Sequence, residues 1–227
     1  PATAPAKPMV LLIIGGGIAA YKALETARQM QRLGLDVTGV MTKSAAQFIT
    51  PLSVAALTNQ KCYDDLFSLT DEAEMGHIRL ARSADLVLVI PATANLMARA
   101  ATGIADDLAT TILLATTAPV LMAPAMNPAM WTHPATSANL TILQQRGVHM
   151  IGPTEGDTAC GEIGSGRMSE PADIAAAAYQ LAVKRPRLLA GKTAIVTAGP
   201  TIEPIDSVRF IANHSSGKQG YAVAAAL

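Results

Sequence analysis

The sequence predicts an α/β protein with a Rossmann-like (flavodoxin-like) doubly wound parallel sheet in a three-layer α/β/α arrangement. Three observations lead to this prediction. Short apolar runs alternate along the chain with segments of helical spacing, which is typical of βαβ units. The runs are apolar at consecutive positions, as expected of parallel strands covered on both faces. The first run, Met9 to Ile14, leads directly into Gly15-Gly16-Gly17 and then a helical segment.

The elements follow from this pattern in chain order. The expected strands are residues 9–14, 36–41, 85–90, 120–123 and 148–151. The expected helices are residues 18–33, 45–49, 51–57, 75–82, a helix ending at 101, 107–115, 134–146 and 171–183. Glycines follow several of these helices, as is common at helix ends. Residues 152–166 contain five glycines and break the alternation, which is typical of a lid or a disordered segment.

The chain divides into a large and a small part. Residues 1–8 are rich in Pro and Ala and are expected to form a disordered leader, and residues 9–184 form the main domain. Residues 185–190 are expected to be a linker. A strand is expected at 192–197, with a helix at the end of the chain. Residues 191–227 are too few to bury a core alone, so we expect them to be the truncated start of a second domain.

Composition narrows the functional class. Half of the 227 residues are hydrophobic, 15% are charged, and the formal net charge is zero, so no basic surface predicts nucleic-acid binding. Met9 to Ile14 is far shorter than the ~20 residues that span a bilayer and lacks the features of a signal peptide. We therefore expect a cytoplasmic protein without membrane contact. Cys62 and Cys160 lie far apart, and neither a disulfide nor a metal site is expected.

A rigid loop presents one amide group after the strand at 120–123. Prolines at 124 and 128 flank Asn127 and restrict the backbone on either side. The carboxyl edge of an open α/β sheet is where ligands bind, so Asn127 is a candidate ligand-binding residue. The alternative is a turn that only caps the strand, above core Met and Trp side chains. The loop alone leaves both interpretations open.

The first glycine turn has the form of a nucleotide-binding loop. Gly15 to Ala20 matches the relaxed G-x-G-x-x-A pattern, in which backbone N–H groups at a helix start bind a phosphate. An NAD site requires an acidic residue after the second strand, but Thr42, Lys43 and Ser44 stand there. These residues favour a phosphate ligand and hence FMN over NAD, and they leave NADP open through Lys43. The alternative is a tight turn without a ligand.

Polar residues also follow the third expected strand. Thr93 and Asn95 are expected at the same sheet edge as Asn127. The alternative role for Asn95 is the N-cap of the next helix, and the two roles are compatible.

A histidine and two cysteines can also be interpreted from their settings in the sequence. His77, near the start of a predicted helix, has an ordinary pKa of ~6.5 and is the best base candidate, although a lone histidine is more often a surface residue. Cys160 lies in the glycine-rich segment, which is an unusual setting for a structural cysteine. Cys62 is interpreted as the structural cysteine.

Taken together, the motifs resemble those of the flavin-dependent cysteine decarboxylases. They are similar, more narrowly, to the decarboxylase half of bifunctional bacterial proteins of coenzyme A synthesis. The motifs occur in the family order: Gly17–Lys22, Met75–Ile78, Pro91–Asn95, Pro124–Trp131 and Ala159–Met168. Ala198–Thr201 and Asn213–Lys218 resemble the opening of the phosphopantothenate–cysteine ligase half, whose activity, with CTP, is expected only of a full-length chain.

The resemblance implies an enzyme. FMN would oxidise the cysteine moiety of the small-molecule substrate 4′-phosphopantothenoylcysteine to a thioaldehyde, CO2 would leave, and the resulting enethiol would be reduced to 4′-phosphopantetheine. His77 would be the base for the oxidation. Asn127 would hold the substrate carboxylate, with Asn95 and Met130 beside it. Cys160 would donate the proton for the final reduction from a flap that closes over the site.

The resemblance also implies a set of FMN contacts. These are Gly16, Gly17 and Ile18 at the turn, Thr42 and Ser44 on the phosphate, and Thr93, Ala125 and Met126 near the ring. Gly17 departs from the family, in which serine is common, so one phosphate contact must come from elsewhere. Members assemble as trimers, or as dodecamers of trimers, with the flavin at a subunit interface, so a homo-oligomer is expected.

Two alternative functions remain on the same fold. One is a prenyl-transferring or NADP-dependent enzyme, against which the Cys160 flap and the Asn127 loop argue. The other is a non-catalytic regulatory flavoprotein, which usually lacks one of the catalytic residues. His77, Asn127 and Cys160 are all present in this sequence, which favours the decarboxylase.

The implied order of steps predicts the behaviour of Cys160→Ser. This variant should still release CO2 but accumulate the enethiol, because oxidation and decarboxylation precede the step that needs the thiol proton. Mass spectrometry of the product, together with CO2 measurement, checks this. Full conversion to 4′-phosphopantetheine by the variant would exclude Cys160 as the proton donor.

Overall fold

The computed structural model describes residues 7–66, 73–157, 161–183 and 193–226. The chain forms two compact units, Pro1–Lys184 and Arg185–Leu227, which are described separately below. The first unit ends at the residue where we predicted the end of the main domain. Most of the predicted leader (1–8) and the predicted linker (185–190) lie outside the described residues.

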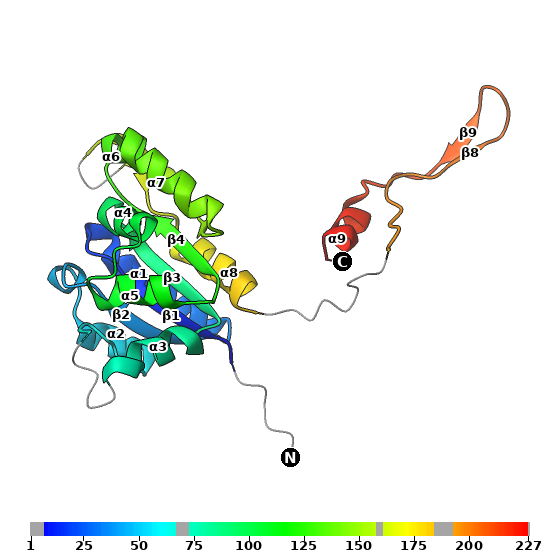
Figure 1. The fold of residues 1–227 in the computed structure, drawn as a ribbon. Helices are drawn as coiled ribbons and strands as arrows, with labels where there is room; N and C mark the ends of the chain where they lie inside the picture. The colour runs from blue at the N-terminus through cyan, green and yellow to red at the C-terminus, as the bar shows by residue number, and fades with distance from the viewer. Residues whose placement is uncertain (1–6, 67–72, 158–160, 184–192, 227) are drawn as a thin grey trace, which may run out of the picture. The chain divides into compact units, whose positions relative to one another are not determined.

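The first unit is built on a parallel five-stranded sheet (Figure 1). Its strands are β1 Met9–Ile14, β2 Asp36–Met41, β3 Leu86–Ala92, β4 Val120–Pro124 and β5 His149–Met150. They lie in the order β2-β1-β3-β4-β5, and each neighbouring pair is parallel. This is the flavodoxin-like order, with the topological switch point between β1 and β3. The predicted fold class is confirmed.

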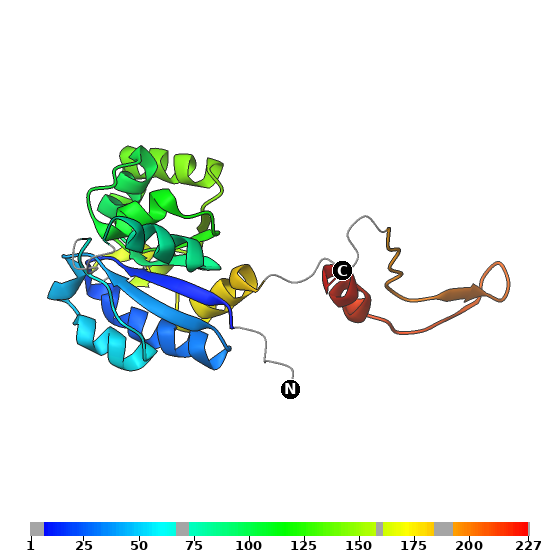
Figure 2. The ribbon, with the colours of Figure 1, turned by 60° about the horizontal axis from the view of Figure 1, so that its bottom comes forward.

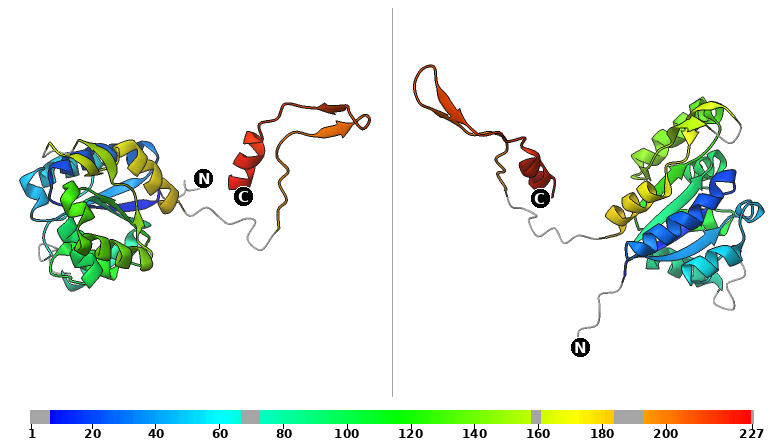
Figure 3. Two further views of the ribbon diagram at one scale, coloured as in Figure 1. Left: turned by 90° about the horizontal axis from the view of Figure 1, so that it is seen from above. Right: turned by 180° about the vertical axis from the view of Figure 1, so that it is seen from behind.

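Helices cover both faces of the sheet (Figure 2). Their bounds are α1 Tyr21–Arg32, α2 Pro51–Thr58, α3 Ala73–Ser83, α4 Ala94–Thr102, α5 Leu108–Ala115, α6 Pro128–Thr132, α7 Pro134–Gln145 and α8 Pro171–Ala182, with short 3-10 helices η1 Ile18–Ala20 and η2 Ala45–Gln47. Helices α1, α2 and α8 pack on one face, where α1 and α8 lie side by side (Figure 3), and α3, α4, α5 and α7 pack on the other. In the described part of the chain, no helix has the length and apolar character to cross a bilayer.

The core explains why the strands are apolar at consecutive positions. In β1, Val10, Leu12 and Ile14 belong to the cluster beneath α1 and α8, while Leu11 and Ile13 belong to the cluster beneath α4 and α5. All five side chains are fully buried. Successive side chains of a strand point to opposite faces, so a strand covered on both sides needs apolar residues throughout.

The carboxyl edge of the sheet differs from the prediction in two places. Strand β3 continues through Pro91 and Ala92, which we had placed in the following loop. A short helix, α6, follows β4 and was not predicted. Five residues are too few to show helical periodicity, although a proline after an N-capping asparagine is a recognisable helix start.

The glycine-rich segment forms a hairpin of β6 Thr154–Asp157 and β7 Ile163–Arg167. A Cβ atom on Gly166 would lie 2.2 Å from the carbonyl oxygen of Met126, and one on Gly164 would lie 3.1 Å from the Pro128 side chain. These two glycines therefore allow β7 to lie against the loop that carries Asn127. Close backbone approach therefore accounts for glycine at these two positions. Residues 158–160, between the two strands, lie outside the described residues.

The second unit contains a hairpin of β8 Ile202–Pro204 and β9 Phe210–Ala212, and a helix, α9 Lys218–Ala226. The helix confirms the prediction for the end of the chain. The strand predicted at 192–197 is wrong for residues 193–197, which have no regular structure; residue 192 lies outside the described residues. A strand requires a partner, and the described residues of this unit pair only β8 with β9. Ile195 and Val208 remain 90% and 84% exposed, as expected of a segment too short to bury a core.

One cluster of charges connects α4 with the start of α5. The Asp107 carboxylate accepts hydrogen bonds from the Thr110 backbone N–H at 2.8 Å and pairs with Arg99 at 2.9 Å, and Thr110 completes a capping box. Burial alone raises the pKa of Asp107, but the hydrogen bonds from Thr110 and Arg99 outweigh burial and leave the pKa below its usual value. Asp106 also pairs with Arg99, but its side chain is 65% exposed, against 27% for Asp107.

This difference predicts unequal effects of two matched substitutions. Asp107→Ala should lower the free energy of unfolding by about 2 kcal/mol, because it removes a helix cap and a partly buried ion pair. Asp106→Ala should cost less than about 0.5 kcal/mol, since its ion pair is solvent-exposed. Chemical denaturation at neutral pH measures both values. Equal costs for the two variants would contradict this assignment.

The same denaturation experiment has an expected pH dependence. Because the folded-state pKa of Asp107 is lowered, its contribution is fully present above the unfolded value of about 3.9 and is lost as the pH falls through the folded value. The difference in stability between wild type and Asp107→Ala should therefore shrink on acidification below about pH 4.

Candidate functional site

The amide of Asn127 has a determined orientation. Its side-chain oxygen caps α6, accepting hydrogen bonds from the backbone N–H groups of Ala129 at 2.7 Å and Met130 at 3.4 Å. A backbone N–H only donates, so the oxygen and not the nitrogen of the amide must face the helix. The oxygen therefore caps a helix, whereas the alternative considered from the sequence was a turn that caps the strand. The nitrogen is left on the opposite side as a hydrogen-bond donor.

That nitrogen donates to a carboxylate from the glycine-rich hairpin. Asn127 Nδ2 lies 2.6 Å from Oε2 of Glu162, the residue directly before β7. The backbone N–H of Met126 donates to the carbonyl of Gly166 at 3.0 Å, which joins β7 to the same loop. The end of β4, the start of α6 and β7 therefore form one connected structure. Glu162 was not predicted as a site residue, although it lies inside the motif Ala159–Met168.

A cavity of about 730 Å³ opens beside this structure, and we call it the Asn127 cavity. It is lined by Gly16–Ala19, Tyr21, Lys22, Pro91, Thr93, Ala94, Ala125–Asn127, Met130, Gly166–Met168 and Glu170. Eight of the predicted site residues line it together: Gly16, Gly17, Ile18, Thr93, Ala125, Met126, Asn127 and Met130. The walls are largely apolar and carry few polar groups, as is typical of sites for small molecules.

A second cavity of about 510 Å³, which we call the Ser44 cavity, lies across the glycine turn. It is lined by Gly15, Gly16, Thr42–Ser44, Thr93, Asn95, Leu96, Arg99, Asp106 and Asp107. Gly16 and Thr93 line both cavities, so the two adjoin at the first glycine turn. The structure places Asn95 in this second cavity, whereas Asn127 and Met130 line the first.

The two hydroxyl groups predicted to bind phosphate differ in exposure. Thr42 is buried, and its hydroxyl donates to the Ile14 carbonyl and accepts from the Ala45 N–H, both at 3.2 Å. Ser44 is exposed, with its oxygen 3.2 Å from that of Thr42. Ser44 is therefore the hydroxyl that a ligand in the cavity reaches, and Thr42 holds the chain that carries it.

Helix α4, which follows β3, is capped by Thr93 and not by Asn95, the residue considered as its cap. Thr93, in an extended conformation, is the N-cap of α4, and its hydroxyl accepts from the Leu96 N–H at 3.3 Å. The N-cap alternative for Asn95 is wrong, because the helix already begins at Ala94. Asn95 is exposed in the first turn, so its side chain is available to a ligand.

Charged groups lie around both cavities. Glu170 accepts from Lys22 at 3.2 Å and from Arg167 at 2.7 Å, and all three residues line the Asn127 cavity. The hydrogen bond from Lys22, followed by that from Arg167, lowers the pKa of Glu170. In the Ser44 cavity, the Nε atom of Arg99 is buried and has no hydrogen-bond partner among the described residues. These residues were not predicted as site residues. The contact of Lys22 with Glu170 joins residues 148 positions apart, so no local pattern indicates it.

The two predicted proton-transfer residues cannot be placed at atomic detail. His77 belongs to α3, and its side chain lies outside the described part of the structure. Cys160 lies outside the described residues. Cys62 is a buried free cysteine, and burial, followed by the charge of Asp64, raises its pKa to about 12. A thiol with this pKa is not ionised near neutral pH, in agreement with its structural assignment.

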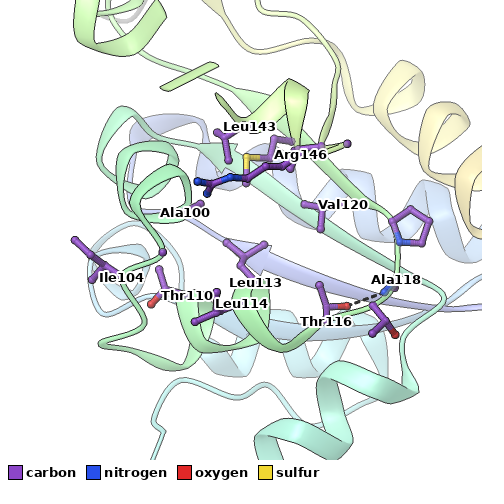
Figure 4. Close-up of a pocket in the computed structure, with 16 residues that line it drawn as sticks. Ala100, Ile104, Thr110, Leu113, Leu114, Thr116, Ala118, Val120, Leu143 and Arg146 are labelled. Carbon is purple, nitrogen blue, oxygen red and sulfur yellow. Dashed lines mark hydrogen bonds between the residues drawn. The ribbon is translucent and has the colours of Figure 1, made fainter. Parts of the chain in front are cut away.

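A third cavity, of about 350 Å³, lies at the start of β4 (Figure 4). Asn127 follows the other end of this strand, so the cavity lies at the opposite edge of the sheet. Its walls are mainly apolar and include Leu113, Val120 and Leu143. Arg146 is the only titratable residue in its lining, and its guanidinium donates to the Ala101 carbonyl at 2.7 Å. Its described lining therefore carries no acidic or histidine side chain, unlike the Ser44 cavity, which holds Asp106 and Asp107.

Comparison with known proteins identifies two matching family models. The model described as "Flavoprotein" matches residues 2–182. The model described as "DNA/pantothenate metabolism flavoprotein C-terminal domain" matches residues 189–227. The two matches correspond to the two compact units.

Similar sequences carry one name. The chain is 49% identical over 217 residues to the coenzyme A biosynthesis bifunctional protein CoaBC of Vibrio vulnificus strain YJ016, covering 96% of this chain and 54% of that protein. It is 47% identical over 218 residues to the protein of the same name from Bacillus subtilis strain 168, again covering 96% and 54%. The chain thus spans about half the length of these relatives.

Similar solved structures include flavin-dependent decarboxylases. A PPC decarboxylase mutant complexed with pantothenoylaminoethenethiol is 33% identical with a TM-score of 0.68, covering 77% of this chain and 98% of that one. The FMN binding protein AtHal3 is 34% identical with a TM-score of 0.69, covering 77% and 96%. The FMN-dependent cysteine decarboxylase SpaF is 30% identical with a TM-score of 0.65, covering 78% and 98%.

The glycine turn allows a matched pair of substitutions. A Cβ atom on Gly16 would lie 2.4 Å from the Ser44 side chain and 2.7 Å from its backbone, whereas one on Gly17 meets no atom closer than 3.9 Å. Gly16→Ala should therefore displace Ser44 and weaken flavin binding at least about tenfold, while Gly17→Ala should change it less than about threefold. Titration of the flavin-free protein with FMN measures both. Equal affinities for the two variants would contradict this account of the turn.

Proposed function

The chain belongs to the flavoprotein family, and from this premise we propose that it catalyses the FMN-dependent decarboxylation of 4′-phosphopantothenoylcysteine to 4′-phosphopantetheine in coenzyme A synthesis. The family expected from the sequence motifs is confirmed by the model matching residues 2–182. Relatives named for coenzyme A biosynthesis and solved structures of PPC decarboxylase and cysteine decarboxylases support the reaction. The observation that carries the proposal is that Asn127 lines the Asn127 cavity and that its amide nitrogen already binds a carboxylate.

The residues of both cavities fit FMN. The flavodoxin-like strand order places the β1/β3 switch point, where such folds bind ligands, beside Gly16. Ser44 and the unpartnered Nε of Arg99 offer donors to a phosphate in the Ser44 cavity. Ala125 and Met126 give the Asn127 cavity an apolar wall suited to a flavin ring. When bound, FMN supplies reversible two-electron chemistry, so that an oxidation and a later reduction leave the cofactor unchanged.

Asn127 orients the substrate in this proposal. Its Nδ2 donates to the substrate carboxylate, and its oxygen, held by the N–H groups of Ala129 and Met130, keeps the donor in place. A held carboxylate aligns the bond that breaks when CO2 leaves. Met130 lines the same cavity and is proposed to contact the substrate, and Asn95 is proposed to contact it from the adjoining Ser44 cavity.

His77 and Cys160 are proposed to move the protons. Histidine suits a base role because its unperturbed pKa of ~6.5 lies near neutral pH, and His77 belongs to α3. Cys160 is proposed as the proton donor, because it belongs to the segment between β6 and β7. Strand β7 contacts the Asn127 loop, so the hairpin is anchored at the cavity where that proton is needed.

We also propose that the protein is a homo-oligomer, a trimer or a dodecamer of trimers. The apolar side chains of Ile18, Tyr21 and Met130 line the Asn127 cavity and are 61%, 59% and 49% exposed. A second copy of the chain covering them would remove apolar surface from water. For residues 191–227 we propose the start of a ligase domain that joins phosphopantothenate and cysteine with CTP in the full-length protein, as the second family match supports.

Asn127→Asp tests the proposal while retaining the cap of α6, although it also replaces the donor to Glu162 with a second carboxylate. Aspartate caps helices as well as asparagine, so α6 and bound flavin should be retained. The variant lacks the amide donor and places negative charge against the substrate carboxylate, so decarboxylation should fall at least about a thousandfold. The measurements are the visible flavin spectrum and substrate-dependent CO2 release.

Asn139→Asp on α7 makes the same chemical change outside the residues that line either cavity, and it should release CO2 like wild type. A wild-type protein without a flavin spectrum would exclude the proposed function. Wild-type rates in Asn127→Asp would exclude Asn127 as the carboxylate anchor.

A further inference from the structure

The Asn127 donor is occupied by a carboxylate of the protein itself. Glu162 Oε2 lies 2.6 Å from Asn127 Nδ2, a short distance typical of a hydrogen bond to a charged acceptor. The two residues are 35 positions apart, so the contact depends on the hairpin and not on local sequence. If Asn127 binds the substrate carboxylate, as proposed above, Glu162 stands where that group must bind.

The surrounding backbone holds both residues at this contact. Asn127 cannot turn its nitrogen away without breaking the cap of α6, because its oxygen accepts from two backbone N–H groups. On the other side, Gly166 contacts Met126 so closely that no Cβ fits between them, and this sets β7 against the loop. Glu162 directly precedes β7, so the position of β7 brings Glu162 to the side-chain amide of Asn127.

Glu162 is nevertheless in a position to move. It lies outside the ladder of β6 and β7, its side chain is exposed, and it follows Gly161, whose φ of +76° lies in the left-handed region. A glycine there leaves the adjoining backbone free to change conformation at low cost. Hydrogen bonds and close backbone contacts hold the loop that carries Asn127. Glu162 itself belongs to no helix or strand.

Two carboxylates do not share this donor without a penalty. The Nδ2 group has two hydrogens, so a second carboxylate could reach the same nitrogen. The two acceptors would then lie within about 5 Å of each other, given ordinary hydrogen-bond lengths, and like charges at that distance repel. Binding of a substrate carboxylate therefore favours the departure of Glu162.

We propose that Glu162 is an intramolecular substitute for the substrate carboxylate and determines how the site distinguishes substrate from product. It binds Asn127 in the ligand-free protein, is displaced when the carboxylate-bearing substrate binds, and returns once CO2 has left. Glu162 thus weakens binding of the carboxylated molecule and has little effect on the decarboxylated one. This inference rests on the proposed function, because it takes Asn127 as the anchor of the substrate carboxylate.

The test compares two unreactive ligands that differ only in the carboxylate. The serine analogue of the substrate has a hydroxyl in place of the thiol, and 4′-phosphopantothenoylethanolamine is the same molecule without the carboxylate. Calorimetric titration of the flavin-loaded protein with each ligand gives two dissociation constants and their ratio. The variants are Glu162→Ala, Glu162→Gln and, as a matched control, Glu155→Ala, which removes the same charge from β6.

Glu162→Ala should bind the serine analogue about five- to tenfold more tightly than wild type, because the competing acceptor is gone. Its affinity for the ethanolamine compound should change less than about twofold. Glu162→Gln retains an uncharged acceptor and should give an intermediate ratio. Glu155→Ala should leave the ratio within about twofold of wild type, since it is not bonded to Asn127.

Several results would overturn the inference. Weaker binding of the serine analogue by Glu162→Ala would mean that Glu162 positions Asn127 and does not compete with the ligand. An unchanged ratio, with flavin retained and wild-type protein decarboxylating the thiol substrate, would remove this inference and leave the proposed function standing. Wild-type protein that binds neither ligand and releases no CO2 would refute the proposed function, and this inference with it.

Discussion

The side-chain oxygen of Asn127 accepts hydrogen bonds from two backbone N–H groups at the start of α6, and these bonds determine which atom of the amide is left to bind another group. A free asparagine presents either end, and its rotation lets a site bind a cation-like or an anion-like group equally well. Here the helix start removes that freedom. The loop therefore offers a hydrogen-bond donor at one defined point, which suits the binding of a carboxylate.

The rest of the carboxyl edge depends on close backbone approach around this donor. Gly166 lies against the Met126 carbonyl, and Gly16 lies against Ser44. In both places a Cβ atom on the glycine would clash with its neighbour. These contacts join three strand ends and the hairpin into one wall shared by two adjoining cavities. A cofactor phosphate on one side of Gly16 and a ring on the other would use both cavities. The third cavity, beside Val120, lacks these features and lies at the opposite edge.

The charged side chains beside the two cavities are paired with one another. Arg99 is paired with acidic groups at the start of α5, yet its Nε atom stays without a partner among the described residues. Lys22 and Arg167 share Glu170 at the other cavity. In each case a cation is held by a carboxylate before any ligand arrives, so its position is determined in advance. At Asn127 the arrangement differs, because a neutral amide donor holds the Glu162 carboxylate, which a substrate carboxylate would displace in the inference drawn above.

The sequence by itself determined the parallel sheet, its strand segments and most helices, because burial on both faces demands consecutive apolar residues and glycines mark the ends. It also selected Asn127, Ser44 and the glycine turn, since prolines, hydroxyls and glycines act through local backbone geometry. Only the tertiary structure showed that Thr42 is buried while Ser44 is exposed, that Asn95 and Asn127 line different cavities, and that Glu162 meets Asn127. Those outcomes depend on contacts between residues distant in sequence, such as β7 against the β4 loop, and no local pattern encodes which side chains such packing brings together.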